Sequence, residues 1–190
     1  MKKSMLAIGT SLILVVGACG ANTADEEKPA EEQTPQEESP QADIEMEHAS
    51  DGEVPEGLQT AEDPAFPVGS KAVIETDHMP GMKGAEATIV GAYDTVAYVI
   101  TYTPADGGEK VKDHKWVVHE EIEGAGEEVF EDGAEVTVLA DHMEGMQGAE
   151  AVIESSEDTT VYMIDYMPTT GGDEVKNHKW VVNSELSDIK

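Results

Sequence analysis

Residues 77–87 read Asp-His-Met-Pro-Gly-Met-Lys-Gly-Ala-Glu-Ala, and residues 141–151 read Asp-His-Met-Glu-Gly-Met-Gln-Gly-Ala-Glu-Ala. These stretches belong to a longer internal repeat, in which residues 66–122 align without a gap on residues 130–186, at an offset of 64 positions. The alignment holds 28 identities in 57 positions. A repeat of this length indicates two copies of one small structural module.

The identities gather in two blocks. The first block is the His-Met-x-Gly-Met turn quoted above, and the second reads Val-Lys-x-His-Lys-Trp-Val-Val at 111–118 and 175–182. The last identity of the repeat pairs Glu121 with Glu185. Each module therefore carries one glycine-rich turn with His and Met, and one short apolar run with His and Trp.

Each module has the pattern of β-strands. A turn is expected near Asp94-Thr95 and near Asp158-Thr159. Four or five short strands in a flat sheet cannot bury enough apolar surface, so each module should curl into a small barrel. The glycine turn followed by Gly-Ala-x-Ala resembles SH3-like barrels of the KOW type. The predicted fold class is all-β, with two tandem small β-barrel-like repeats. The expected strands are 70–76, 85–92, 96–103 and 114–118, with copies at 134–140, 149–155, 160–167 and 178–182.

The first residues of the chain read as an export signal. Lys2 and Lys3 precede an apolar run at 5–16 that is too short to span a membrane. The following Val16-Gly17-Ala18-Cys19 resembles a lipobox, which implies cleavage before Cys19 and lipidation of its thiol. We expect a lipid-anchored protein on the extracellular face of the cell membrane. The expected domains are a signal peptide at 1–18, a disordered acidic linker at 19–64, and repeat modules at 65–126 and 127–190.

Composition excludes several functions. The chain of 190 residues has 41 acidic and 11 basic residues, a net charge of −30 and no arginine, which argues against nucleic acid as a partner. Its single cysteine, Cys19, excludes an intrachain disulfide and a cysteine-based zinc site. No Ser or Cys lies in a nucleophile–base setting, and a doubled site suits stoichiometric binding. We therefore do not expect an enzyme.

The repeated blocks contain ligands for a soft metal ion. Neutral imidazole nitrogen and thioether sulfur suit Cu(I), whereas carboxylate and water suit hard cations. The glycines of the turn allow it to close tightly, so that its His and Met side chains can converge. Trp116 and Trp180 are candidate cation–π caps over the bound ion. The predicted ligands are His78, Met79, Met82, His114, His142, Met143, Met146 and His178.

The lipobox, the acidic linker and the tandem His-Met-x-Gly-Met and His-Lys-Trp-Val-Val blocks resemble copper-resistance surface lipoproteins of the CopL/YdhK type. The His, Met and Trp set is also similar to periplasmic Cu(I) chaperones of the CusF kind. The resemblance implies extracellular copper binding that limits copper entry, with Cu(I) as the bound ion and the membrane contacted through the anchor. A copper exporter is a further candidate partner, and we expect a monomer.

Two alternatives stay open from the sequence. Paired SH3-like domains often bind glycans or peptides, and Tyr98, Tyr102 and Trp116 would supply the aromatic surface of a cell-wall or polymer-binding module. The same metal sites would instead take Zn²⁺ or Cu²⁺ if Asp77 and Asp141 added oxygen ligands. The other Met and His residues are expected to pack, to lie on the surface or to bind further ions weakly: Met46, His48, His119, Met163 and Met167.

Overall fold

A computed structural model describes residues 52–190 of the chain, so the predicted signal peptide, Cys19 and most of the linker lie outside the described residues. The described part consists of strands and two short 3₁₀ turns, which confirms the all-β prediction. Within it, no helix is long and apolar enough to cross a membrane. The elements are β1 (Gln59–Thr60), β2 (Lys71–Ile74), β3 (Glu86–Thr103), β4 (Val111–Val118), η1 (His119–Glu121), β5 (Glu135–Thr137), β6 (Glu150–Tyr166), β7 (Val175–Val182), η2 (Asn183–Glu185) and β8 (Leu186–Ser187).

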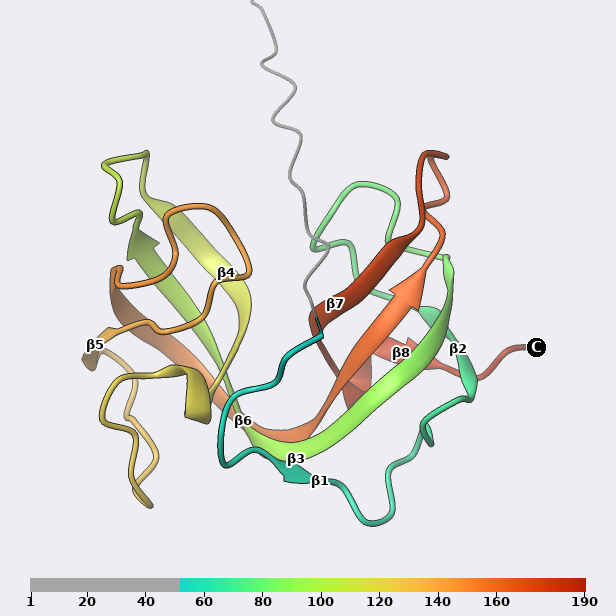
Figure 1. Cartoon of the computed structure of the whole chain (residues 1–190), viewed down its shortest axis with the longest axis horizontal. Coiled ribbons are helices and arrows are strands. Elements are labelled where there is room, and N and C mark those ends of the chain that lie inside the picture. Colours follow the sequence, from blue (N-terminus) through green and yellow to red (C-terminus); the bar gives the residue numbers. More distant parts are fainter. Residues whose placement is uncertain (1–51) are drawn as a thin grey trace, which may run out of the picture. The chain divides into compact units, whose positions relative to one another are not determined.

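Strands β3 and β6 form the central ladder of the sheet (Figure 1). They have 18 and 17 residues and pair antiparallel along almost their whole lengths. At the centre of this ladder Thr95 lies opposite Thr159, which is its own copy in the second repeat. The same symmetry holds toward both ends, because Ala87 lies opposite Tyr166 and Tyr102 lies opposite Ala151. A local two-fold axis therefore passes through the Thr95–Thr159 pair and relates the two repeats.

The turns predicted at Asp94-Thr95 and Asp158-Thr159 are wrong, because both strands run through these positions. Backbone groups that would turn in an isolated module instead pair with the other repeat. The side chains are also satisfied in the extended form, since Thr160 Oγ1 donates to Asp94 Oδ1 at 2.7 Å and Thr95 Oγ1 donates to Glu120 Oε2 at 2.7 Å. Tertiary pairing overrides the local turn signal here.

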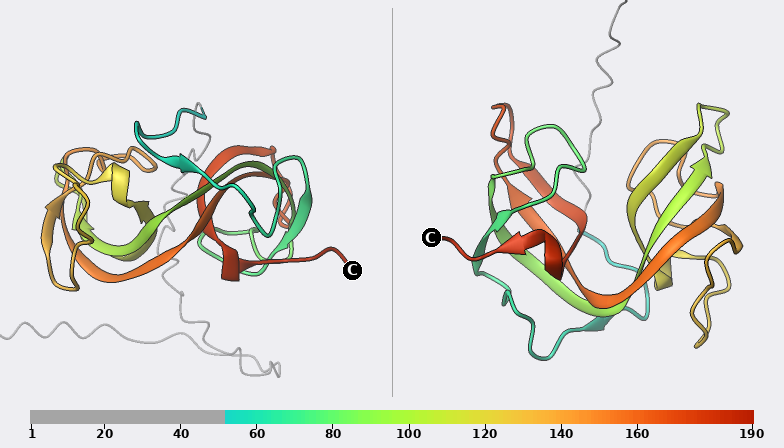
Figure 2. Two further views of the ribbon diagram at one scale, coloured as in Figure 1. Left: turned by 90° about the horizontal axis from the view of Figure 1, so that it is seen from below. Right: turned by 180° about the vertical axis from the view of Figure 1, so that it is seen from behind.

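The long ladder carries two lobes, one at each end (Figure 2). Lobe A joins the first half of β3 and the second half of β6 with β2, β7 and β8. Lobe B joins the second half of β3 and the first half of β6 with β4 and β5. Each lobe is thus built from both repeats and has its own apolar core. Two tandem repeats in an all-β fold agree with the prediction, whereas closure of either lobe into a barrel is not shown, since all eight strands of the described residues belong to one sheet.

A third apolar cluster lies between the lobes and contains Trp116 and Trp180. It also holds Val118 and Val182, the last residues of β4 and β7, and these two strands contact each other where the lobes meet. The repeated His-Lys-Trp-Val-Val blocks are therefore neighbours across the local two-fold axis. This junction brings residues that are 64 positions apart in the sequence into one region of the molecule.

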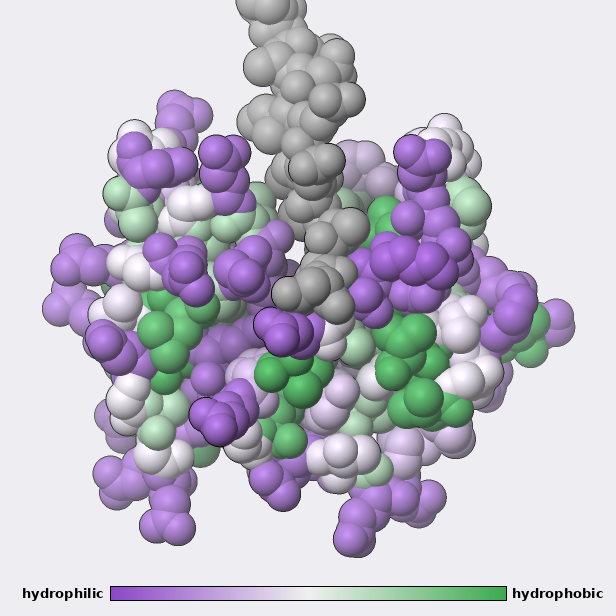
Figure 3. Space-filling model, viewed as in Figure 1, coloured by the Kyte–Doolittle hydropathy of each residue, from purple (hydrophilic) through white to green (hydrophobic). Residues whose placement is uncertain are grey.

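The outer surface is mostly hydrophilic on the face that Figure 3 shows, with separate apolar patches between polar side chains. Scattered exposed apolar residues of this kind are common on soluble proteins and need no partner to explain them. Among the described residues, the exposed large apolar side chains are Val54, Val68, Val129, Leu139, Met167 and Ile189.

Candidate metal centre

A pocket of about 240 Å³ lies between the lobes and is lined by the loops at 78–79 and 142–143 and by β4 and β7. It gathers six of the eight ligands predicted from the sequence. Four are the repeated histidines, and two are the first methionine of each turn. The predicted ligands that line the pocket are His78, Met79, His114, His142, Met143 and His178.

The remaining two predicted ligands, Met82 and Met146, do not line the pocket. Each is 0% exposed and packs in the core of its own lobe. The turn explains this placement: Met82 N donates to Met79 O at 3.2 Å, and Gly81 has a φ of +84°, so the chain folds back sharply between the two methionines. Met79 stays beside the pocket while the unbranched Met82 side chain fills space in the apolar core.

Each turn histidine is held by a carboxylate, which is buried for Glu121 and partly buried for Glu185. His78 Nε2 lies 2.7 Å from Glu185 Oε1, and His142 Nε2 lies 2.7 Å from Glu121 Oε1. Because a carboxylate only accepts hydrogen bonds, the shared proton belongs to Nε2 in the neutral ring. The Nδ1 atoms of His78 and His142 are buried and have no hydrogen-bond partner in residues 52–190. A neutral ring held this way presents a bare Nδ1 lone pair, the arrangement found in carboxylate–histidine–metal sites.

Glu185 has further donors around it. Trp116 Nε1 donates to Glu185 Oε2 at 2.9 Å, and the backbone N–H of Val182 donates to the same oxygen at 3.1 Å. Burial opposes ionisation of Glu185, but the hydrogen bond from His78, the positive charge of that ring when it is protonated, and the bonds from Trp116 and Val182 outweigh burial and hold the pKa of Glu185 below its usual value. The carboxylate is therefore ionised in the folded protein.

Glu121 has the same surroundings. It accepts hydrogen bonds from Trp180 Nε1 at 3.1 Å and from the backbone N–H of Val118 at 3.1 Å, both at Oε2. Sequence reasoning did not select either glutamate as a site residue. The signal was present, because Glu121 and Glu185 form the last identity of the repeat and lie three residues after the end of the repeated Trp block. No spacing rule links them to the histidines, since the contact is made through the fold.

The tryptophans thus have a different place from the predicted cation–π cap. Trp116 and Trp180 do not belong to the pocket lining and instead pack between the lobes, where their indole N–H groups bind the two glutamates. The cation that lies over Trp116 is the ammonium of Lys115, at 5.0 Å from the ring centroid. The Trp180 ring lies 6.4 Å from that of His142, at an angle of 75°.

The histidines, methionines and tyrosines at the pocket form two groups, which the local two-fold axis relates. In lobe B, Tyr102 Oη donates to Met143 Sδ at 3.7 Å, the His114 ring packs edge-on against Tyr102 at 5.8 Å, and the His114 and His142 rings are 6.5 Å apart. In lobe A, Tyr166 Oη lies 4.0 Å from Met79 Sδ and the Tyr166 ring packs against His178 at 5.9 Å.

The two tyrosines stay neutral. Burial raises the pKa of Tyr166 to about 12, and burial together with the nearby charge of Asp106 raises the pKa of Tyr102. Both phenols are therefore donors toward sulfur and not anionic ligands at neutral pH. The pocket offers imidazole and thioether groups, and the two neutral phenols lie behind its methionines.

The residues on which the two alternative functions depend do not line the pocket. Asp77 and Asp141 are exposed and do not line the pocket, so the structure does not bring oxygen ligands from these positions to the histidines. Tyr98 and Tyr102 are 0% and 1% exposed, and Trp116 is 6% exposed, so they form no open aromatic groove for a polymer.

The Met and His residues outside the predicted ligand set do not line the pocket where the structure describes them. Met163 packs in the cluster between the lobes, and Met167 is exposed. His119 is fixed by two hydrogen bonds and so holds a loop in place: its Nε2 donates to Gly126 O at 2.9 Å, and Tyr98 Oη donates to its Nδ1 at 2.9 Å. Met46 and His48 lie outside the described residues.

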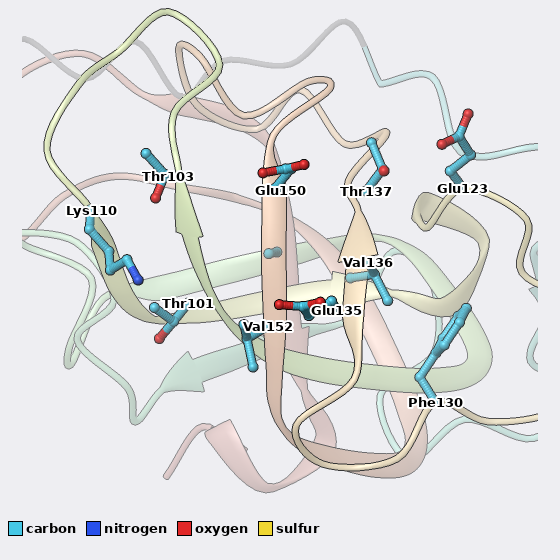
Figure 4. A pocket seen from close by; sticks show the side chains of 11 residues that line it. Thr101, Thr103, Lys110, Glu123, Phe130, Glu135, Val136, Thr137, Glu150 and Val152 are labelled. Atoms are coloured by element: carbon cyan, nitrogen blue, oxygen red, sulfur yellow. The ribbon is translucent and has the colours of Figure 1, made fainter.

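Within residues 52–190 no group of three or more His, Cys, Asp or Glu is close enough to hold a metal ion. Any site in the pocket therefore needs the thioethers as donors beside the imidazoles. A second cavity, of about 480 Å³, lies over β5 and β6 (Figure 4). Its lining is mostly threonine, valine and glutamate, with Lys110 and Phe130 and without His or Met, so it has no ligand for a soft ion.

Comparisons with known proteins agree with the repeat. Residues 68–119 and 132–183 each match the family described as "Protein of unknown function (DUF1541)". The chain is 50% identical over 190 residues to "Uncharacterized protein YdhK" of Bacillus subtilis (strain 168), covering 98% of this chain and 91% of that protein. None of these descriptions names copper, so the copper role stays a prediction.

Solved structures are similar as well. A crystal structure of ydhK, a DUF1541 family protein from Bacillus subtilis, aligns with a TM-score of 0.73 at 55% identity, over 75% of this chain and 97% of that chain. The solution NMR structure of the ydhK C-terminal domain aligns with a TM-score of 0.62 at 58% identity, over 65% of this chain and 93% of that one. The chain belongs to the DUF1541 family and carries two copies of its repeat.

Proposed function

We propose that this protein binds copper as Cu(I) outside the cytoplasm, anchored by a lipid at Cys19, and thereby limits copper entry in copper resistance. One observation carries the proposal. The buried Nδ1 atoms of His78 and His142 lack a hydrogen-bond partner in the described residues, and both rings line a pocket that also contains Met79 and Met143. Leaving a buried polar atom unpaired is costly, so its presence twice, by symmetry, favours a ligand role.

The donor set supports Cu(I) over divalent ions. Thioether sulfur is a soft ligand that favours Cu(I), whereas imidazole alone would also accept zinc. Charge does not decide between the ions, because Lys112, Lys115 and Lys179 line the pocket together with Asp113, and the carboxylates of Glu121 and Glu185 contact its histidines.

The proposed location fits this chemistry. A thioether, unlike a thiol, forms no disulfide and needs no deprotonation, so it persists as a ligand in an oxidising space outside the cytoplasm. The anchor rests on Val16-Gly17-Ala18-Cys19, which lies outside the described residues.

The test is an anaerobic Cu(I) titration of the mature chain against a coloured Cu(I) chelator. We expect about two tightly bound Cu(I) per chain, one for each turn. Replacing Met79 and Met143 by Leu should remove this binding, whereas the matched control, Met82 and Met146 to Leu, should keep it. Leu for Met conserves apolar volume, so both variants should fold. Absence of tight Cu(I) binding in the wild-type chain would contradict the proposal.

A further inference from the structure

The histidines of the pocket pair across the repeats rather than within them. In the sequence, His114 belongs with His78 and Met79, because all three lie in the first repeat. In the fold, β4 belongs to lobe B, where Val111 and Val117 pack in the core that also contains the turn of the second repeat. Because each lobe combines strands of both repeats, the turn and the Trp block of one repeat lie in different lobes.

Measured contacts show the same crossing. The His114 ring lies 6.5 Å from the His142 ring. Tyr102 contacts both His114 and Met143, and His142 precedes Met143 directly in the chain. Two imidazoles on opposite sides of one ion, with metal–nitrogen bonds of about 2.0 Å, have ring centroids about 6 Å apart. The observed distance thus fits a shared ion with only a small adjustment of the rings.

The second group follows by the local two-fold axis. Met79 lies against Tyr166, and His178 packs edge-on against the same ring at 5.9 Å. His78 precedes Met79 directly and lines the same pocket as His178. Each group thus contains two residues of one turn and one histidine from the Trp block of the other repeat.

We propose that the two Cu(I) sites are composite, one formed by His114, His142 and Met143 and the other by His78, His178 and Met79. This inference rests on the proposed copper function and assigns the ligands of that same pocket. It makes the pair of repeats the smallest unit that binds: a single repeat holds a turn and a Trp block but cannot bring them onto one ion. The residues of both sites line the same pocket.

The experiment compares two double variants that carry the same types of substitution. In the first, His114→Gln is combined with Met143→Leu, so both changes fall in one composite site. In the second, His114→Gln is combined with Met79→Leu, so the changes fall in different composite sites but in one repeat. The mirrored pair, His178→Gln with Met79→Leu or with Met143→Leu, repeats the test if one variant does not fold. Folding is checked by near-UV circular dichroism before each Cu(I) titration.

For composite sites, the first variant should keep about one of two tight Cu(I) and the second should keep none. The reverse result, loss of both ions in the first variant and of one in the second, would assign the ligands within each repeat and overturn the inference. Equal losses in the two variants would also overturn it, because they would indicate one joint site. A wild-type chain that binds no Cu(I) would refute the proposed function itself, and the ligand assignment with it.

Discussion

Glu121 offers the sharpest perturbation of the site. It accepts three hydrogen bonds, from His142 at 2.7 Å, from Trp180 at 3.1 Å and from the backbone of Val118 at 3.1 Å, and it is 5% exposed. The change Glu121→Gln keeps the shape of the side chain but replaces one oxygen by an amide nitrogen. The amide oxygen can still serve the two donors that share Oε2. The amide N–H₂ group then lies beside His142 Nε2.

This exchange should move a proton on the ring. An amide nitrogen can only donate, so His142 Nε2 must become an acceptor and the ring proton must shift to Nδ1. The Nδ1 lone pair, which we expect to bind copper, is then lost in the apo protein. Loss of such an orienting partner costs roughly 10- to 100-fold in metal affinity.

The effect on stability should be moderate. Three charge-assisted hydrogen bonds become neutral ones, at about 1 kcal/mol each, so the free energy of unfolding should fall by about 3 kcal/mol. The Glu121→Ala variant would instead leave three buried donors without an acceptor, at about 1–3 kcal/mol each, and should lose a large part of the stability of the chain.

The assay is nitrogen-15 NMR of the histidine rings in the apo protein, at a pH above the ordinary histidine pKa. We expect His142 as the Nε2–H tautomer in the wild type and as the Nδ1–H tautomer in Glu121→Gln. His78 serves as an internal control, since Glu185 is intact, and Glu127→Gln is the matched surface control because Glu127 is exposed. The same His142 tautomer in the wild type and in Glu121→Gln would refute the reasoning.

Three further predictions concern Glu185, Tyr102 and Cys19. The free energy of unfolding should fall as the pH drops below about 4.5. The ionised Glu185 stabilises the fold above the ordinary glutamate pKa, and this contribution is lost as the pH falls through the lowered pKa of Glu185. Urea unfolding at several pH values should show a smaller fall in Glu185→Gln than in the wild type, and equal falls would contradict the role of this carboxylate. Tyr102→Phe should leave about two Cu(I) bound, because a neutral phenol is no ligand, and the loss of one Cu(I) equivalent in a titration would show that the phenol binds the metal. Cys19→Ala should move the protein from the membrane fraction into the medium, and its retention on membranes would argue against the lipid anchor.

The sequence was sufficient for the class of fold and for much of the pocket. Period-two apolar runs predicted strands close to β2, β4, β5 and β7, and the repeated blocks contained all four histidines that line the pocket. These features are local, because the pleat of a strand and the geometry of a glycine turn depend on neighbouring residues.

The pairing of β3 with β6 across the two repeats could not be predicted from such local features. Asp94-Thr95 is a plausible turn in an isolated module, and only pairing with the other repeat makes extended backbone better there. The same non-local pairing decides that His142 meets Glu121 and that His114 lies near His142. The sequence also did not distinguish Met79 from Met82, since both lie in one tight turn and only the packed core selects which of them is buried.

The most direct test of copper binding in this pocket is carbon-13 NMR of methionine methyl groups during anaerobic addition of Cu(I). The wild-type chain contains its own control, because Met79 and Met143 line the pocket while Met82 and Met146 are 0% exposed in the lobe cores. We expect the methyl signals of Met79 and Met143 to shift and to saturate at about two equivalents, with those of Met82 and Met146 almost unchanged. Unchanged signals of Met79 and Met143, with Cu(I) bound elsewhere or not at all, would contradict the proposed site.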